Sequence, residues 1–349
     1  MRFYKNQHKY YCGIDLHSTT MYVCIVDQSG AVLVHRNIPA EPQKLLNLLV
    51  PYREDVVVGV ECMFCWYWLS DLCTEEGIPF VLGHALYMKA IHGGKAKNDK
   101  IDSEKIALLL RSGMLPESYA YPKEFRAARD LTRRRSFFVR KRSELFAHIQ
   151  MTYQQYNFTA PGRKIAYKAN REVMEKPFQD ESALKAIEAD LALVESYSEI
   201  IRKLEAHITK LTRRNNPFAM DFALLQTIPC IGPILASTIL YEVHDIKRFP
   251  SVQHFCSYAR LVKPQKTSAG KVTGGGGGKI GNQHLKWAFS EAAVFFLRTE
   301  QGKQYFERLR NKFSKAKALS VLAHKLGRSV YFILLRKQQW SDQKLHMAA

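Results

Sequence analysis

The stretch from residue 97 to residue 110 constrains the fold most, because it places two carboxylates at the start of an apolar helix. Asp99 and Asp102 share one face of that helix, since side chains three positions apart are neighbours on a helix. The buried stripe that orients this face consists of Ile106, Leu109 and Leu110. An ordinary alternative is that Asp99 caps the helix and that Asp102 complements the positive end of its dipole.

Two further carboxylates each follow a β-type run upstream of this helix. Asp15 closes a run that begins at Tyr11, and a polar turn and a second strand over 21–27 follow it, which predicts a β-hairpin. Glu61 ends the run 56–61, whose near absence of polar residues predicts a central strand buried on both faces. Because an unpaired buried carboxylate is costly, a cation or hydrogen-bond donors are expected beside Glu61.

Four acids on two strands and a helix predict a site for a divalent metal, Mg²⁺ or Mn²⁺. Hard cations of this kind take oxygen ligands. Two such ions about 4 Å apart activate an attacking oxygen and stabilise a leaving one in phosphoryl transfer. The predicted metal ligands, which are also the predicted catalytic acids, are Asp15, Glu61, Asp99 and Asp102.

The order of these acids, together with the string KNDKID over 97–102, resembles the RuvC-like, RNase H-fold domain of DEDD transposases. These transposases are the recombinases of the insertion-sequence-110 family, which is related to the Piv DNA invertases. Ser103 departs from the pattern, because Ala is commoner there in the family. The resemblance implies an α/β, RNase H-like (RuvC-like) N-terminal domain.

Length and pattern predict two or three domains. We place a first domain, which the resemblance implies is a RuvC-like DEDD domain, over 1–122, a helical coiled-coil arm over 123–216 and a mainly α C-terminal domain over 217–349. In the first domain the hairpin and the strand 56–61 precede a helix and a further strand over 80–83. This βαβ order after a hairpin independently predicts an α/β sheet with its acids near the strand ends.

The chain carries 52 Lys and Arg against 32 Asp and Glu, a formal net charge of +20. Such an excess raises association rates and non-specific affinity for nucleic acid. An anionic membrane surface is the competing partner, but no apolar run approaches 18 residues and the first ten residues lack a signal-peptide core. We therefore expect a soluble, cytoplasmic protein without a membrane partner, in which the run 330–335 is part of a core.

The seven cysteines predict reduced thiols, because an odd number within apolar or strand-like runs does not suggest a disulfide framework. Cys62 and Cys65 have zinc-knuckle spacing, and His84 and His92 would be needed to complete such a site. The aromatic and aliphatic residues around this pair favour an ordinary buried helix over zinc.

Basic and apolar residues alternate along the first half of the arm, which predicts phosphate contacts. The alternative is a solvated helix face. A basic loop before the acidic helix adds Lys97 to the predicted nucleic-acid-binding residues. The candidates within the arm are Arg133, Arg134, Arg135, Arg140, Lys141 and Arg142.

A narrow apolar stripe with a spacing of three and four residues runs over 181–214, which is typical of coiled-coil packing. The stripe can pair with the helix 131–153 of the same chain or with another protomer, and periodicity does not choose between them. Because a recombinase holds several DNA ends, a homo-oligomer, a dimer or a tetramer, is expected.

The C-terminal part opens with a helix, a Pro/Gly turn and a second helix over 224–240. This pattern indicates a helix-hairpin-helix-like segment whose turn amides face a phosphate. A plain αα-hairpin has the same pattern. The net charge favours binding to a nucleic-acid backbone.

The segment 261–282 combines one candidate nucleophile, Ser268, with lysines and five consecutive glycines. The glycines predict a mobile loop whose backbone can approach a ligand closely, at a high entropic cost of ordering. Cations beside Ser268 would stabilise the negative charge of a phosphorane. A linker without a role is the alternative. The lysines, all predicted to bind nucleic acid, are Lys263, Lys266, Lys271 and Lys279.

Strings in this part follow the C-terminal transposase domain of the same family in order, at 228–233, 248–251, 257–261, 268–271 and 280–282. The resemblance implies that Ser268 is the nucleophile and forms a phosphoserine link to DNA while the acids and Mg²⁺ assist. It also implies a guide (bridge) RNA that pairs with target and donor DNA. Cys230, where Gly is commoner, and the glycine run depart from the pattern, and only the match favours Ser268 over Thr267.

Together with these observations, the resemblance implies an RNA-guided DNA transposase or recombinase. A Holliday-junction-type, metal-dependent endonuclease that uses the four acids and water is the enzymatic alternative. A non-catalytic RNA- or DNA-binding factor, in which the acids are caps and salt-bridge partners, is the third. Covalent capture of DNA separates the first hypothesis from the other two.

Overall fold

The computed structural model describes residues 2–91, 98–159, 165–167, 170–171, 177–213, 217–263, 266–274 and 280–341. The chain forms two compact units, Met1–Lys123 and Glu124–Ala349. The arm and the C-terminal helices, which we predict as separate domains, therefore belong to the same unit.

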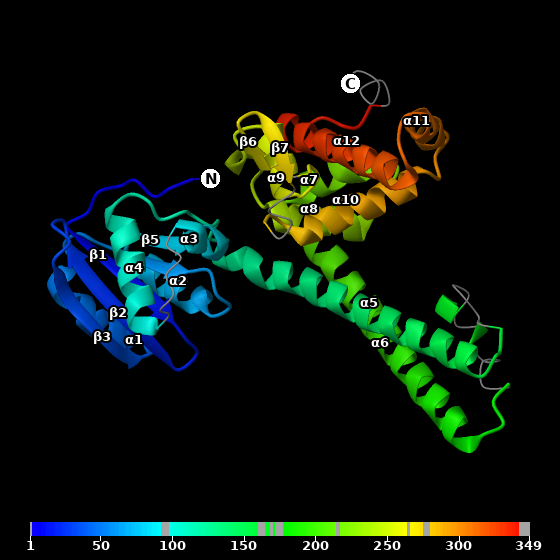
Figure 1. Cartoon of the computed structure of the whole chain (residues 1–349), viewed down its shortest axis with the longest axis horizontal. Coiled ribbons are helices and arrows are strands. Elements are labelled where there is room, and N and C mark those ends of the chain that lie inside the picture. Colours follow the sequence, from blue (N-terminus) through cyan, green and yellow to red (C-terminus); the bar gives the residue numbers. More distant parts are fainter. Residues whose placement is uncertain are drawn as a thin grey trace. The chain divides into compact units, whose positions relative to one another are not determined.

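A mixed five-stranded sheet forms the centre of the first unit (Figure 1). Its strand order is β3-β2-β1-β4-β5, with β1–β2 and β2–β3 antiparallel and β1–β4 and β4–β5 parallel. The predicted hairpin and the predicted central strand are both confirmed. The strands are β1 (Tyr10–Leu16), β2 (Thr20–Asp27), β3 (Val32–Pro39), β4 (Val56–Glu61) and β5 (Phe80–Gly83).

Helices cover both faces of this sheet. On one face, α1 (Pro42–Leu49) and α2 (Trp66–Glu75) pack on the even-numbered residues of β1. On the other face, α4 (Asp99–Arg111) packs on Tyr11 and on its neighbours in β2 and β4, beside α3 (Ala85–Ile91). The predicted α4 stripe is confirmed, because its members are at most 3% exposed. The short helix η1 (Val50–Tyr52) follows α1.

Gly13 lets α4 lie directly against β1. A Cβ atom on Gly13 would lie 2.2 Å from the carbonyl oxygen of Ser103 and 2.3 Å from the amide nitrogen of Ala107. No side chain fits at such distances, so glycine is required at this crossing. Ser103 is itself fully buried, which explains why a small residue occupies that position.

Two long helices of the second unit, α5 (Lys123–Gln155) and α6 (Glu181–Arg213), lie side by side (Figure 1). Every seventh residue of α6 is buried over most of its length. Polar contacts bind the two helices together, including Arg135 to Glu205 and Arg142 to Ser198. The stripe is thus paired within the chain, whereas coiled-coil geometry and oligomerisation stay predictions. The heptad-spaced residues are Ile187, Val194, Ile201 and Ile208.

The C-terminal helices share one core with the base of α5. The elements are α7 (Ala219–Gln226), α8 (Pro233–Val243), η4 (Ile246–Arg248), α9 (Val252–Tyr258), the hairpin β6 (Lys266–Ser268) and β7 (Lys271–Gly274), α10 (Gln283–Phe296), α11 (Glu300–Arg310) and α12 (Lys315–Arg336). Gly232 and Pro233 start α8 after the predicted turn. Phosphate binding by that turn stays a prediction.

Among the described residues, α12 is the one helix long and apolar enough to cross a membrane. However, Leu322, Leu326 and Val330 of α12 are fully buried against the other C-terminal helices. Residues 330–334 belong to this core or pack against it, as predicted, whereas Leu335 is 40% exposed. This packing is that of a central core helix.

The predicted reduced thiols and the buried helix after Cys62 are confirmed. All seven cysteines are free, and Trp66 and Leu69 of α2 are buried. Within the described part of the chain, neither Cys62 nor Cys65 belongs to a metal-type cluster. His92 lies outside the described residues.

Candidate active site

Asp15 and Glu61 lie side by side at the carboxyl ends of two parallel strands. Ile14 of β1 pairs with Val60 of β4, so the next residue of each strand is an acid. Side chains alternate between the faces of a strand, and Tyr11 and Gly13 face α4. Asp15 therefore lies on the α4 face, as does Glu61, which follows Val57 and Gly59 at the same spacing.

The first turn of α4 brings two more acids to this face. Asn98 is the N-cap residue, and its side-chain oxygen accepts a hydrogen bond from the Ile101 amide at 2.8 Å. The capping alternative for Asp99 is therefore wrong, and its carboxylate is available for other contacts. Asp102, one turn later, forms an ion pair with Lys105 at 3.3 Å.

His17, which our sequence analysis did not select, lies between the acids. Its Nε2 atom is 3.6 Å from Oδ2 of Asp15 and 3.4 Å from Oδ2 of Asp99. The ligand atoms of these three residues all lie within 4.8 Å of one another. In the sequence, the signal that could have pointed to His17 was its position in the turn after β1, two residues beyond Asp15.

The electrostatics of Asp15 show an accumulation of negative charge. Burial raises the pKa of Asp15, and the negative charges of Asp99, Asp102 and Glu61 raise it further, while His17 opposes this shift. Asp102 and Glu61 are thus within electrostatic reach of Asp15, although they lie outside the tight group of three. A bound cation would relieve this repulsion, so the oxygen donors fit a hard divalent ion.

Ser268 belongs to the second unit, where it ends β6 and is exposed. Residues 266–274 form a β-hairpin where we predict a mobile loop, and Ser268 pairs with Lys271 across the turn. Ala269 and Gly270 have φ angles of 50° and 77°, and positive φ at both turn residues matches the twist of a two-residue hairpin.

Of the predicted lysines, Lys263 and Lys271 are exposed. Lys266 lies in β6, but its side chain is outside the described part, as is that of Thr267. Lys97 and Lys279, and the glycines 275–278, also lie outside the described residues. Their nucleic-acid contacts stay predictions.

Hydrogen bonds hold together the two ends of the segment that carries Ser268. The amide of Asn282 donates to the carbonyl of Tyr258 at 2.6 Å, and Nε of Arg260 donates to the carbonyl of Gly281 at 2.9 Å. Gly281 has a φ angle of 91°, and a Cβ there would lie 2.6 Å from the Tyr258 oxygen. The segment is therefore anchored at a fixed base.

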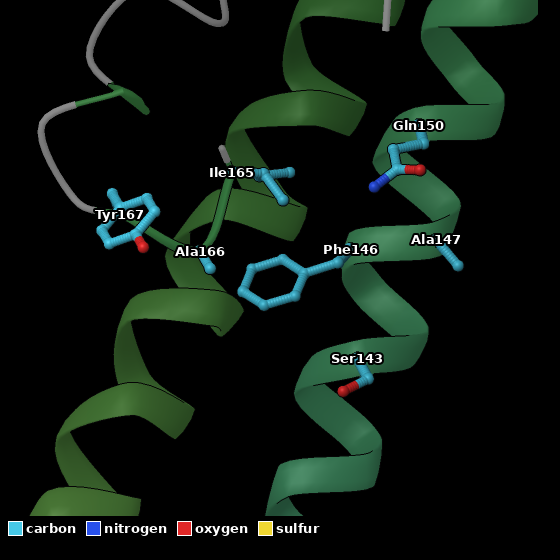
Figure 2. Close-up of a pocket in the computed structure, with 7 residues that line it drawn as sticks. All are labelled: Ser143, Phe146, Ala147, Gln150, Ile165, Ala166 and Tyr167. Carbon is cyan, nitrogen blue, oxygen red and sulfur yellow. The ribbon is translucent and has the colours of Figure 1, made fainter. Parts of the chain in front are cut away.

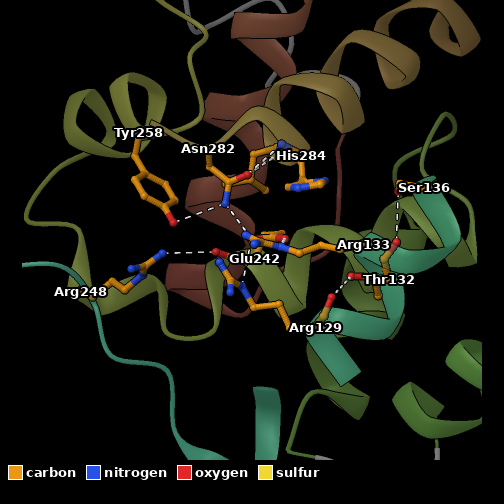
Figure 3. A network of polar contacts seen from close by, with 10 residues as sticks. Arg129, Thr132, Arg133, Ser136, Glu242, Arg248, Tyr258, Asn282 and His284 are labelled. Atoms are coloured by element: carbon orange, nitrogen blue, oxygen red, sulfur yellow. Dashed lines mark hydrogen bonds and ion pairs between the residues drawn. The ribbon is translucent and has the colours of Figure 1, made fainter. Parts of the chain in front are cut away.

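Glu242, at the end of α8, connects this base to α5 (Figure 3). Its fully buried carboxylate accepts hydrogen bonds from Arg129, from both Nε and Nη2 of Arg133, and from Nδ2 of Asn282 at 2.7 Å. Burial alone would raise the pKa of Glu242, but these hydrogen bonds and positive charges lower it to about 2. Asn282 also caps α10 through its side-chain oxygen.

Three of the arginines predicted to bind nucleic acid have partners within the protein. Arg133 is bound to Glu242 and Arg135 is bound to Glu205, so both guanidinium groups have internal partners. Arg142 is half-buried and donates to Ser198 at 3.2 Å. The sequence pattern did not show these internal partners, and nucleic-acid binding by the three arginines stays a prediction.

Arg134 and Arg140 are exposed on the middle part of α5, and Lys141 lies nearby. Arg134 and Lys141 lie 5.7 and 5.9 Å from the ring centre of Phe137, which is 37% exposed. Lys141 also forms a surface ion pair with Glu144. We call Arg134, Arg140 and Lys141 the outer basic face of α5.

A separate pocket of about 460 Å³ lies between α5 and residues 165–167 (Figure 2). Its lining is mostly apolar, with Phe146 and Ile165 in its wall. Residue 164 and residue 168 are outside the described ranges. We assign this pocket no function.

Two family models match different parts of the chain. A model of IS110-type DEDD transposases matches residues 12–158, which contain all four acids. A second model, described as the transposase IS116/IS110/IS902 family, matches residues 222–307, which contain Ser268 and Asn282.

Curated relatives agree with these matches. The chain is 24% identical over 341 residues to a probable family 20 transposase of Pseudomonas aeruginosa, covering 93% of this chain and 96% of the relative. It is 22% identical over 341 residues to the transposase for insertion sequence element IS1111A of Coxiella burnetii, covering 94% and 90%. An insertion element IS110 protein of Streptomyces coelicolor is 28% identical over 41% of this chain and 35% of its own length.

The two family matches and the two relatives matched over most of their length define the class of the protein: it is an enzyme that recombines DNA. The chain carries both transposase domains of the IS110 family, and it is a transposase. The DEDD transposase domain implies an RNase H-like fold for the first unit.

Proposed function

We propose that this transposase cleaves and rejoins DNA through Ser268, that a divalent metal held by Asp15, Glu61, Asp99 and Asp102 assists it, and that a guide RNA directs it. The observation that carries the proposal is the gathering of these carboxylates on the α4 face of the sheet, with a pKa of Asp15 raised by burial and by its acidic neighbours. When bound, the metal supplies positive charge for a phosphodiester undergoing substitution.

In the proposed reaction, the Ser268 oxygen forms a bond to the phosphorus of a DNA phosphodiester. The bond from phosphorus to the oxygen of one strand end breaks, and the serine proton is finally carried by that leaving oxygen. The protein–DNA ester conserves the bond energy, so the strands can be rejoined by the reverse substitution without ATP. Lys263 and Lys271 neutralise charge on the phosphate.

The nucleic acid contacts of the arm are assigned to its outer basic face, Arg134, Arg140 and Lys141. A guide RNA is supported by the resemblance and by the net charge of +20. A homo-oligomer, a dimer or a tetramer, and a cytoplasmic location are parts of the same proposal.

Denaturing gels of labelled DNA test the chemistry. Wild-type protein should give a protein–DNA adduct that survives denaturation, Ser268→Ala should bind DNA without forming it, and Thr267→Ala is the matched control that should retain it. An adduct that persists in Ser268→Ala would overturn the role of Ser268. Nicked DNA with no adduct in the wild type would support the nuclease instead.

The four acids are tested by Asp15→Asn, Glu61→Gln, Asp99→Asn and Asp102→Asn, which remove charge but little volume. Each should abolish cleavage while the circular dichroism spectrum is unchanged. Cleavage by wild-type protein in excess chelator would contradict the metal-dependent mechanism.

A further inference from the structure

We propose that Nε2 of His17 is a third protein ligand, with Asp15 and Asp99, of a divalent ion, and that it shifts the preference of the site from Mg²⁺ toward Mn²⁺. This inference rests on the proposed metal-dependent function but adds a nitrogen donor to the set of four acids. The class of ligand is a divalent transition-metal ion.

The spacing of the three donors suits a single ion. The Nε2 atom lies 3.6 Å from the Asp15 oxygen and 3.4 Å from the Asp99 oxygen, and all three ligand atoms are within 4.8 Å of one another. Ligands held about 2.1 Å from an octahedral ion lie about 3 Å apart when adjacent and about 4 Å apart when opposite. Small side-chain rotations would bring the three donors into that geometry.

The Nε2 atom also lacks another partner. It is buried, although the imidazole as a whole is 41% exposed, and it has no hydrogen-bond partner in the described part of the chain. Its distances to the carboxylates exceed those of a normal hydrogen bond. A buried polar atom without a hydrogen bond is costly, and coordination to a metal would satisfy it.

The backbone around His17 is fixed before any ion binds. The His17 amide donates to the carbonyl of Thr20 at 2.9 Å, which closes the β1–β2 turn. The thiol of Cys65 contacts the carbonyl of Leu16 at 3.5 Å. The imidazole is thus carried by a short, hydrogen-bonded turn next to Asp15, as a preorganised ligand requires.

The nitrogen donor gives the proposal its specificity. Mg²⁺ takes oxygen ligands, keeps several waters and rarely uses nitrogen, whereas imidazole is a common ligand of transition metals. Four carboxylates alone would serve both ions. With His17 in the ligand set, Mn²⁺ should gain affinity relative to Mg²⁺.

The test is electron spin echo envelope modulation of the full-length chain loaded with Mn²⁺ alone. The wild type should show nitrogen modulation from a coordinated imidazole, and His17→Asn and His17→Gln should lose it. His35→Asn is the matched control and should keep it, because His35 lies beside α4 but contacts the Lys100 carbonyl.

Calorimetric titration supplies the second measurement. In His17→Asn the ratio of Mn²⁺ affinity to Mg²⁺ affinity should fall about tenfold or more. If wild-type protein binds Mn²⁺ without nitrogen modulation, His17 is only an ion-pair partner and this inference fails, while the acidic metal site remains. If wild-type protein binds neither ion, the metal site of the proposed function fails as well.

Discussion

Two largely buried carboxylates, one in each unit, have pKa values that are shifted in opposite directions. Asp15 lies among other acids, and burial and their charges raise its pKa. Glu242 is completely buried, yet two arginines and an asparagine lower its pKa to about 2. The comparison teaches that burial does not by itself mark a functional acid: Glu242 has internal partners that satisfy it, whereas Asp15 has neighbours that a cation would have to neutralise.

The largest effect on stability is expected from removing the charge of Glu242. Glu242→Gln should lower the free energy of unfolding by about 3–5 kcal/mol, because Arg129 and Arg133 would be left without their counter-charge. Urea denaturation followed by circular dichroism measures it. Asp15→Asn is the matched control and should leave the stability of the metal-free protein unchanged or slightly raised, since it removes repulsion. Equal losses in both variants would refute the comparison.

The same pair predicts a pH dependence. The pKa of Glu242 is lowered from 4.5 to about 2, so its contribution to stability is present above about pH 4.5 and is lost as the pH falls toward 2. The difference in unfolding free energy between wild type and Glu242→Gln should therefore shrink on acidification. A difference that stays constant from pH 6 to pH 3 would show that charge is not the cause.

A smaller effect is expected at Asn282. Asn282→Ser retains an N-cap oxygen for α10 but removes the donor to Glu242, so we expect a loss of about 1 kcal/mol in stability. Because Asn282 closes the base of the Ser268 segment, the rate of adduct formation should fall more than DNA affinity does. Thr299→Ser, at the N-cap of α11, is the control for changing a cap. An unchanged adduct rate would make the contact purely structural.

The smallest effect on stability is expected on the outer basic face. Replacing Arg134 and Arg140 with Gln should leave the unfolding free energy nearly unchanged while flattening the salt dependence of DNA or RNA binding by about one unit of slope per lost contact. In Arg135→Gln, by contrast, Glu205 loses its partner, so stability should fall. Salt titrations of nucleic-acid binding test the role of the outer basic face. An unchanged slope of affinity against salt in the double variant would favour the solvated-face alternative.

The sequence was most informative where the signal was local. The hairpin, the buried β4 and the α4 stripe follow from periodicity, and these elements bring Asp15, Glu61 and Asp99 to one face. The partners of the arm arginines were not predictable in this way. Arg133 finds Glu242 at a separation of 109 residues and Arg135 finds Glu205 at a separation of 70, and a basic run contains no signal for such distant acids.

His17 and the hairpin at Ser268 were missed for a different reason. A histidine in a polar turn has no periodicity, so its proximity to Asp99 depends on how α4 crosses the sheet. Ala269-Gly270 is a weaker turn signal than Asn-Gly, and the neighbouring glycines suggested mobility. Both features depend on tertiary packing or on a backbone conformation that composition does not specify.

The absence of a side chain at Gly13 sets the separation between α4 and the sheet, and Asp99 and Asp102 are carried on that helix. A methyl group added at position 13 would push the helix outward and move these acids away from Asp15 and His17, while every acid remained in place along the chain. The distances from Asp99 and Asp102 to Asp15 and His17 therefore depend on Gly13, a residue that lies under α4 and is not itself a ligand.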